Sequence, residues 1–182
     1  MSGLVFDAAY PPGSVPAGAA GVMGYVGGAA YHVWTPAEWA PFHGIRQYPV
    51  WVAESGAADA QADAAVKAVA KLGWVAHAAD ARVIVVDLET AAERAWYQVF
   101  AMTVAAAGYW PVAYGSLSTV LGNAASNNIV ADWDGIKSIP AGQTINGVQY
   151  AANVAAAGAA VDWSLFDSWL MARGGVGPRT GS

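Results

Sequence analysis

The chain has 182 residues, with 8 Lys and Arg against 13 Asp and Glu, no cysteine, and a formal net charge of −5. This length fits one domain with a sizeable core. So few cations in an acidic chain argue against a nucleic-acid-binding surface, and the lack of cysteine excludes disulfides, thiol nucleophiles and Cys-containing zinc sites. No stretch approaches the ~18 consecutive apolar residues of a membrane span, and the first residues lack a basic region. We therefore expect neither a membrane span nor a signal peptide in the chain.

Short apolar runs recur along the chain and predict eight strands. The clearest run, Arg82–Glu89, has a β-branched core that is apolar on both faces, as in a strand of a parallel sheet. The other seven runs are Leu4–Asp7, Gly21–Val26, Pro49–Glu54, Trp110–Gly115, Asn128–Asp132, Ile145–Tyr150 and Ala159–Trp163. The stretch Ala151–Ala160 is rich in alanine and glycine, which favours a loop between the last two strands.

Three helices are predicted between the early strands. Residues Ala57–Leu72 carry apolar side chains at helical spacing and precede a glycine, the usual C-terminal stop. A second helix is expected from Thr90 to Gly108, opening with a Thr-x-x-Glu capping box. A third, shorter helix begins at Thr35-Pro36, because proline is favoured at the first helical position. Helical patterns fade after Tyr114.

The alternation of strands and helices predicts a right-handed, parallel α/β arrangement. Eight strands fit a barrel, but 182 residues is below the ~200 that a regular (β/α)8 barrel needs. An irregular, TIM-like (β/α) barrel of eight strands with the last helices missing reconciles the two numbers, and a doubly wound open sheet is the alternative. We expect the barrel to occupy residues 1–172, with a Gly/Pro-rich C-terminal arm at 173–182.

Acidic residues stand at the C-terminal ends of the predicted strands. These residues are Asp7, Glu54, Asp87, Glu89, Asp132 and Asp162. In a barrel such ends converge on one face, where active sites are built. Asp87 and Glu89 are two residues apart, so both side chains leave the same face of their strand. A carboxylate at a strand end can also cap the next helix, but repetition on several strands favours a shared acidic cleft.

Closely grouped carboxylates have two chemical uses. Their repulsion raises the pKa of one of them, so that a protonated acid coexists with an ionised partner, and this pairing suits cleavage of a glycosidic bond. We expect Glu89 to be the group with the raised pKa. The rival use is a divalent cation, but Asp132–Gly135 lacks the remaining ligands of a calcium loop. We therefore predict no metal and no cofactor.

Five short motifs occur in order along the chain. They are Phe6-Asp7, Val86-Asp87-Leu88-Glu89, Ala113-Tyr114-Gly115, Gln149-Tyr150 and Val161-Asp162. In these motifs the sequence resembles the family 25 glycoside hydrolases, which are lysozyme-type muramidases, and especially their divergent relatives in actinobacteria and phages. The resemblance covers about Gly3 to Leu170 and implies an irregular barrel without late helices. It implies that Glu89 donates the proton and that Asp87 orients or stabilises. Asp7 and Asp162 would complete the acidic floor.

Polar and aromatic residues beside the acids are candidates for binding sugar, since an aromatic ring packs on the apolar face of a pyranose. They are Tyr25, Glu54, Tyr114, Asp132, Trp133, Gln149 and Tyr150. We therefore expect a glycoside hydrolase that cleaves cell-wall polysaccharide of the peptidoglycan type, outside the cytoplasm, at the wall or on a virion.

Two strands depart from the family pattern. The second reads Met23-Gly24-Tyr25-Val26-Gly27-Gly28 in place of a charged motif, and the third ends in Ala53-Glu54 where the family carries an aromatic–His–aromatic run. These departures favour an alternative, a catalytically degenerate barrel that serves as a wall-binding or structural module, for instance on a phage particle. The charge-poor surface and the C-terminal arm would then contact other copies or a virion assembly.

Overall fold

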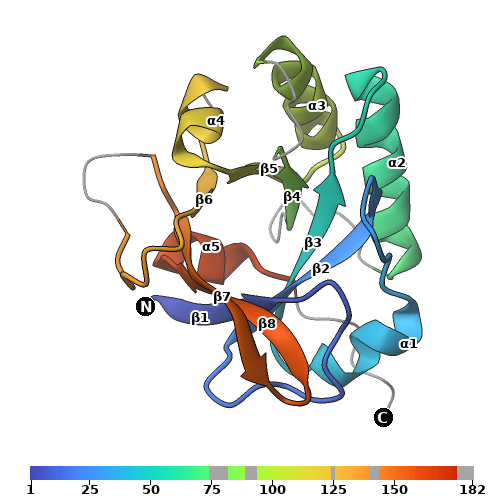
Figure 1. Cartoon of the computed structure of the whole chain (residues 1–182). Helices are drawn as coiled ribbons and strands as arrows, with labels where there is room; N and C mark the ends of the chain where they lie inside the picture. Colours follow the sequence, from blue (N-terminus) through green and yellow to red (C-terminus); the bar gives the residue numbers. More distant parts are fainter. Residues whose placement is uncertain (74–81, 89–93, 124–125, 140–143, 176–182) are drawn as a thin grey trace.

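Eight strands form one closed barrel in chain order (Figure 1). The computed structural model describes residues 1–73, 82–88, 94–123, 126–139 and 144–175. The strands are β1 (Gly3–Asp7), β2 (Gly21–Gly28), β3 (Arg46–Val52), β4 (Val83–Asp87), β5 (Trp110–Gly115), β6 (Asn128–Ala131), β7 (Gly147–Ala156) and β8 (Ala159–Phe166). The prediction of an irregular α/β barrel is confirmed, and because the sheet closes on itself the doubly wound open sheet is wrong.

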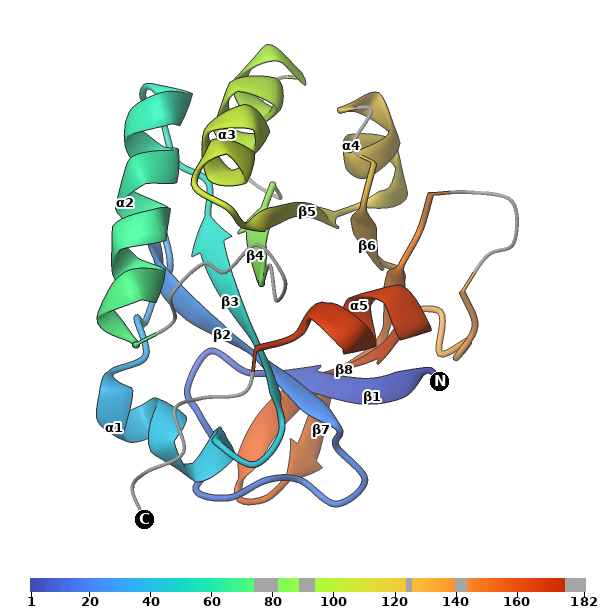
Figure 2. The same ribbon diagram turned by 180° about the vertical axis from the view of Figure 1, so that it is seen from behind.

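Helices pack against the outside of this barrel and across one of its ends. They are α1 (Pro36–Trp39), the 3-10 helix η1 (Ala40–Phe42), α2 (Ala58–Lys71), α3 (Arg94–Ala106), α4 (Leu117–Gly122) and α5 (Ser168–Arg173). Helices α2, α3 and α4 lie along one side, and the β7–β8 hairpin lies on the other side in both views (Figure 2). The predicted helices at Ala57–Leu72 and after Thr35 are confirmed. The predicted start of the second helix at Thr90 lies outside the described residues.

The direction of the last strand differs from the prediction. Strands β1 to β7 run parallel, whereas β8 is antiparallel to both β7 and β1. A turn of only two residues, Ala157 and Gly158, joins β7 to β8, and so short a connection can only return the chain antiparallel. Both residues have positive φ angles, 49° and 83°, as a tight hairpin turn requires.

The prediction of a loop at Ala151–Ala160 was therefore wrong. Residues Ala151–Ala156 continue β7, and Ala159 and Ala160 begin β8. Alanine has a low strand propensity, but here the backbone ladder between the two strands holds the extended conformation. Pairing across the hairpin has overridden local preference.

Two layers of apolar side chains fill the molecule. The barrel interior is formed by Val5, Met23, Tyr48, Val50, Val83, Val85, Val112, Tyr114, Ile129, Phe166 and Leu170. Alternate residues of the same strands, such as Phe6, Ile84 and Val86, point outward into a second layer shared with the helices. None of the described helices is long and apolar enough to cross a membrane.

The N-terminal end of the barrel is closed by α5. Leu170 from this helix is fully buried among the interior residues. Beyond the helix, Gly175 pairs with Gln47 of β3 through two backbone hydrogen bonds, and Arg46 Nη1 donates to the Gly174 carbonyl at 3.0 Å. The strand-end acids lie at the opposite, C-terminal end of the barrel.

Candidate active site

Three acidic side chains meet at the C-terminal mouth of the barrel. Asp7 ends β1, Asp87 ends β4, and Asp162 lies directly opposite Asp7 in the antiparallel register of β8. Asp7 and Asp87 are buried, whereas Asp162 is half-buried. Glu89, the fourth residue predicted to be catalytic, lies outside the described residues.

Asp7 and Asp87 share a small hollow at this mouth. Its wall also includes Tyr25 from β2 and Tyr114 from β5, and its volume is about 10 Å³. That volume is near the smallest that holds one water molecule. The hollow therefore brings together two predicted catalytic acids and two predicted sugar-binding tyrosines around a water-sized space.

Gln149 of β7 connects this acidic floor through its side-chain amide. Its Nε2 donates to Asp7 Oδ2 at 3.0 Å and to Asp162 Oδ2 at 3.3 Å. Its Oε1 accepts from the Tyr114 hydroxyl at 2.8 Å and from the Trp133 indole. Because ionised carboxylates only accept, the nitrogen must face them, and the orientation of the amide is fixed. Gln149 uses its donors on the acids and its acceptor on the aromatic residues.

Burial raises the pKa of the Asp162 carboxyl above its ordinary value of 3.8. The backbone N–H of Asn153 donates to Oδ1 at 2.7 Å and opposes this rise. The sequence predicted a raised pKa for Glu89 through mutual repulsion, and Glu89 lies outside the described residues. The rise at Asp162 has another cause, burial.

Asn153 is a residue of this site that sequence reasoning missed. It has a positive φ of 56°. The pairing register of β7 against β8 shifts twice near it, between Gln149 and Ala151 and between Ala151 and Val154. Such a bulge re-aims the backbone, and here its N–H points at Asp162. The available signal was an asparagine inside an alanine-rich run, since asparagine adopts left-handed conformations more readily than most residues.

The remaining predicted sugar-binding residues lie at the rim or face away. Trp133 is 59% exposed, although its indole N–H is bonded to Gln149. Glu54 and Asp132 are also exposed, and the Glu54 backbone exchanges two hydrogen bonds with the Gln61 side chain of α2. Tyr150 packs against the outer layer, because consecutive strand residues point to opposite faces and Gln149 points inward.

The described residues give no support to a cation site. Among them, no three His, Asp or Glu side chains lie close enough together to hold a metal. Asp134, within the segment Asp132–Gly135, accepts from the Ile136 N–H at 2.7 Å. This is a local Asx-type turn, so the carboxylate stabilises its own loop.

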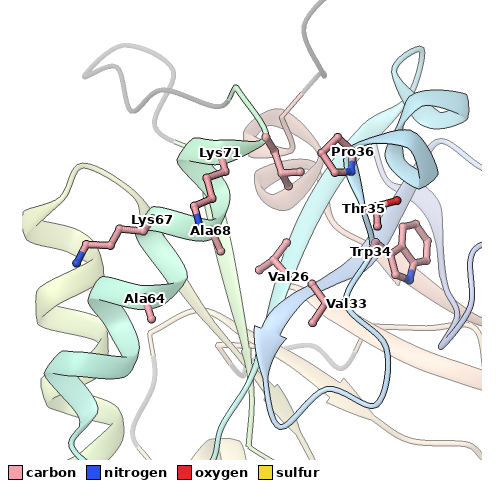
Figure 3. Close-up of a pocket in the computed structure, with 10 residues that line it drawn as sticks. Val26, Val33, Trp34, Thr35, Pro36, Ala64, Lys67, Ala68 and Lys71 are labelled. Carbon is pink, nitrogen blue, oxygen red and sulfur yellow. The ribbon is translucent and has the colours of Figure 1, made fainter.

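A larger cavity, of about 490 Å³, lies away from the acids. Figure 3 shows Ala64 and Ala68 of α2 facing Val26 and Val33 across it. The charged groups in its lining are Lys67 and Lys71, and the lining contains no carboxylate. Without an acid this cavity cannot carry out carboxylate chemistry, so the smaller hollow at the barrel mouth is the candidate active site.

The barrel has counterparts among proteins of known structure. No protein-family model and no curated protein matches the chain. Its fold is nevertheless that of the lysozyme, endolysin and glycosyl hydrolase 25 proteins, with identities low enough that the likeness is one of fold.

Three solved structures illustrate this likeness. The catalytic domain of endolysin ply40 from bacteriophage P40 of Listeria monocytogenes has a TM-score of 0.70 at 16% identity, covering 96% of this chain and 98% of its own. The bacterial lysozyme from Streptomyces coelicolor has a TM-score of 0.67 at 18% identity, covering 94% and 96%. A glycosyl hydrolase 25 of Streptococcus pneumoniae has a TM-score of 0.66 at 9% identity, covering 92% and 88%.

Proposed function

We propose that the protein is a glycoside hydrolase that cleaves bacterial cell-wall polysaccharide of the peptidoglycan type, acting at the wall. The observation that carries this proposal is the acidic floor of Asp7, Asp87 and Asp162, with Gln149 holding two of these carboxylates. The fold shared with a lysozyme and an endolysin supports the choice of substrate.

The proposed roles follow from the chemistry of glycoside cleavage. The leaving oxygen must be protonated while positive charge develops on the sugar ring. Glu89, two residues beyond Asp87 in the sequence, is the proposed donor of this proton. Asp87 is buried at the mouth and would stabilise the developing charge. Asp7 and Asp162, held by Gln149, would keep the floor negative.

Sugar release from purified peptidoglycan sacculi tests this proposal. We expect the wild type to generate reducing ends and lower the turbidity of the suspension. Glu89→Gln and Asp87→Asn should each reduce the rate at least about a hundredfold, the size typical of a lost general acid. Asp63→Asn is the matched control, since Asp63 is an exposed acid on α2 and should leave the rate unchanged. Absence of sugar release from several wall types would contradict the proposal.

One observation favours a second function, a wall-binding module without catalysis. The hollow between Asp7 and Asp87 is too small for a sugar ring, and β2 carries no charged residue beside it. Co-sedimentation with sacculi separates the two functions. A binding module would sediment with the walls and release no reducing ends, whereas the hydrolase would do both.

A further inference from the structure

A group of three rings lies at the same mouth as the acids. The Tyr10 ring stacks on His32 with ring centroids 4.8 Å apart, and it meets the edge of Tyr31 at 6.1 Å. Tyr10 follows β1, and the other two residues follow β2. Because β1 and β2 are parallel, both connections leave from the end of the barrel that holds Asp7. We call these three residues the aromatic platform.

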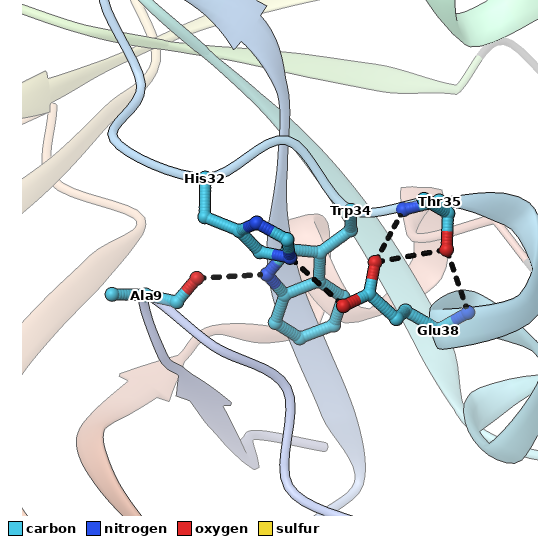
Figure 4. Close-up of polar contacts among 5 residues, drawn as sticks. All are labelled: Ala9, His32, Trp34, Thr35 and Glu38. Atoms are coloured by element: carbon cyan, nitrogen blue, oxygen red, sulfur yellow. Dashed lines mark hydrogen bonds and ion pairs between the residues drawn. The ribbon is translucent and has the colours of Figure 1, made fainter.

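Hydrogen bonds fix the His32 ring of the platform (Figure 4). His32 Nε2 lies 2.8 Å from Glu38 Oε1. The other oxygen of Glu38 accepts from the Thr35 backbone N–H at 2.7 Å and from the Thr35 hydroxyl at 2.9 Å. These bonds complete the capping box of α1, so the carboxylate that orients His32 is itself held by the start of a helix.

The two connections that carry the platform are also tied to each other. The indole Nε1 of Trp34 donates to the Ala9 carbonyl at 3.3 Å, and the Trp34 backbone N–H donates to the Tyr25 carbonyl at 2.9 Å. Trp34 is fully buried, so this link is part of the core. The platform therefore stands on a fixed base that continues into Tyr25, which lines the hollow between the acids.

The two tyrosine rings of the platform are open to solvent. Tyr31 is 87% exposed and Tyr10 is 55% exposed. Clustered aromatic rings on a monomer's surface mark a binding site more often than single exposed side chains do. Tyr10 is three residues beyond Asp7, so their α-carbons lie within about 11 Å of each other. A chain molecule seated on the acids can therefore reach the platform.

We propose that the aromatic platform is a sugar-stacking subsite, which holds the cell-wall glycan strand beyond the sugars that lie over the acids. This inference rests on the proposed function. The apolar C–H face of a β-linked sugar packs on an exposed tyrosine ring, and the tyrosine hydroxyls can exchange hydrogen bonds with sugar hydroxyls. A fixed platform loses little conformational freedom when it binds, which favours affinity.

Titration with N-acetylglucosamine oligomers of two and six units tests the subsite. All proteins carry Glu89→Gln, so that the sugars are not cleaved. In this proposal a dimer occupies only the sugar positions over the acids, whereas a hexamer is long enough to occupy these positions and the platform together. Adding Tyr31→Ala should weaken hexamer binding about three- to tenfold and leave dimer binding unchanged. Tyr31→Phe, which keeps the ring, should retain hexamer affinity within about twofold.

Met102→Ala is the control for loss of an exposed apolar side chain, since Met102 is 72% exposed on α3, and it should change neither affinity. Hexamer affinity that is unchanged by Tyr31→Ala, or a loss that is equal for dimer and hexamer, overturns the subsite while the proposed function stands. A parent protein that binds neither oligomer, together with a wild type that releases no sugar from sacculi, overturns both.

Discussion

Gln149 is the residue that joins the acidic side chains at the barrel mouth. It bridges Asp7 and Asp162, which come from opposite ends of the chain, and it orients Tyr114 and Trp133 through one oxygen. Because Gln149 is buried, each of these contacts replaces a hydrogen bond to water. The amide thus fixes the relative positions of two carboxylates of the floor.

Replacing Gln149 should destabilise the fold. Gln149→Ala leaves a buried tyrosine hydroxyl and two carboxylates without their shared amide, and each unsatisfied buried group costs about 1–3 kcal/mol. We expect the free energy of unfolding to fall by about 2–4 kcal/mol, as measured by urea denaturation. Gln98→Ala, at an exposed position of α3, should change it by less than about 0.5 kcal/mol. Equal effects of the two substitutions would show that the amide is not a structural centre.

The raised pKa of Asp162 predicts a pH dependence of stability. A folded pKa above the unfolded value means that the stability contribution of this group is complete below the ordinary value of 3.8 and is lost as pH rises through the folded value. The variant Asp162→Asn has no carboxyl group to ionise at this position, so it does not lose stability in this way as pH rises. The stability of the variant relative to the wild type should therefore increase from acid to neutral pH.

Urea denaturation at a series of pH values measures this difference for Asp162. Asp59→Asn, at an exposed position in the first turn of α2, serves as the control and should show no such increase. A difference between Asp162→Asn and wild type that stays constant with pH would mean that burial does not disfavour the charged carboxylate.

At the scale of elements, the β7–β8 hairpin takes the place of the last helices of a regular barrel. It turns through two residues with positive φ, and a bulge at Asn153 directs one of its N–H groups to Asp162. The hairpin therefore both closes the barrel against β1 and supplies part of the acidic floor. The conformation of Ala157 at the turn is unfavourable, because the left-handed region is disfavoured for an L-residue with a Cβ.

Ala157→Asn should stabilise the hairpin. Asparagine followed by Gly158 is the preferred pair for a tight hairpin turn, and relief of the left-handed alanine should raise the free energy of unfolding by about 1 kcal/mol. Ala155→Asn is the matched control, because Ala155 is exposed on β7, outside the turn, where asparagine is a poor strand former. Thermal and urea melts compare the two. Stabilisation by both substitutions would point to a cause other than turn geometry.

At the scale of the whole molecule, one end of the barrel is closed by a helix and the other end carries the strand-end acids. Helix α5 closes the first, with Leu170 buried beneath Tyr48 and Phe166, and Tyr48 donates to the Leu170 carbonyl at 3.1 Å. Burial raises the pKa of Tyr48, so this hydroxyl remains a neutral donor. The strand-end acids lie at the opposite end, and the packed interior between the two ends supports them from below.

Leu170→Ala should lower the stability of the whole barrel. Removing a fully buried leucine leaves a cavity at the closed end and costs about 2–5 kcal/mol. Leu121→Ala, at a 45% exposed position of α4, should cost far less. Urea denaturation measures both variants, and equal losses would show that α5 is not part of the main core.

Much of this protein follows from local sequence pattern. The run Trp110–Gly115 matches β5, the helical spacing at Ala57–Leu72 matches α2, and Thr35-Pro36 marks the start of α1. The placement of acids at strand ends likewise predicted that Asp7, Asp87 and Asp162 would share one mouth, although Glu54 and Asp132, predicted with them, are exposed. Such features depend on residues that are close neighbours in the chain, because side-chain periodicity and capping act over a few residues.

Other features were decided only by tertiary structure. The antiparallel course of β8, the strand conformation of Ala151–Ala156 and the left-handed Asn153 depend on pairing across the hairpin. The bond from Gln149 to Asp7 joins residues 142 positions apart, and the platform joins Tyr10 to His32 from separate connections. Register and barrel closure create these contacts, and both arise from the balance of packing and hydrogen bonding over the whole chain, which no local pattern encodes.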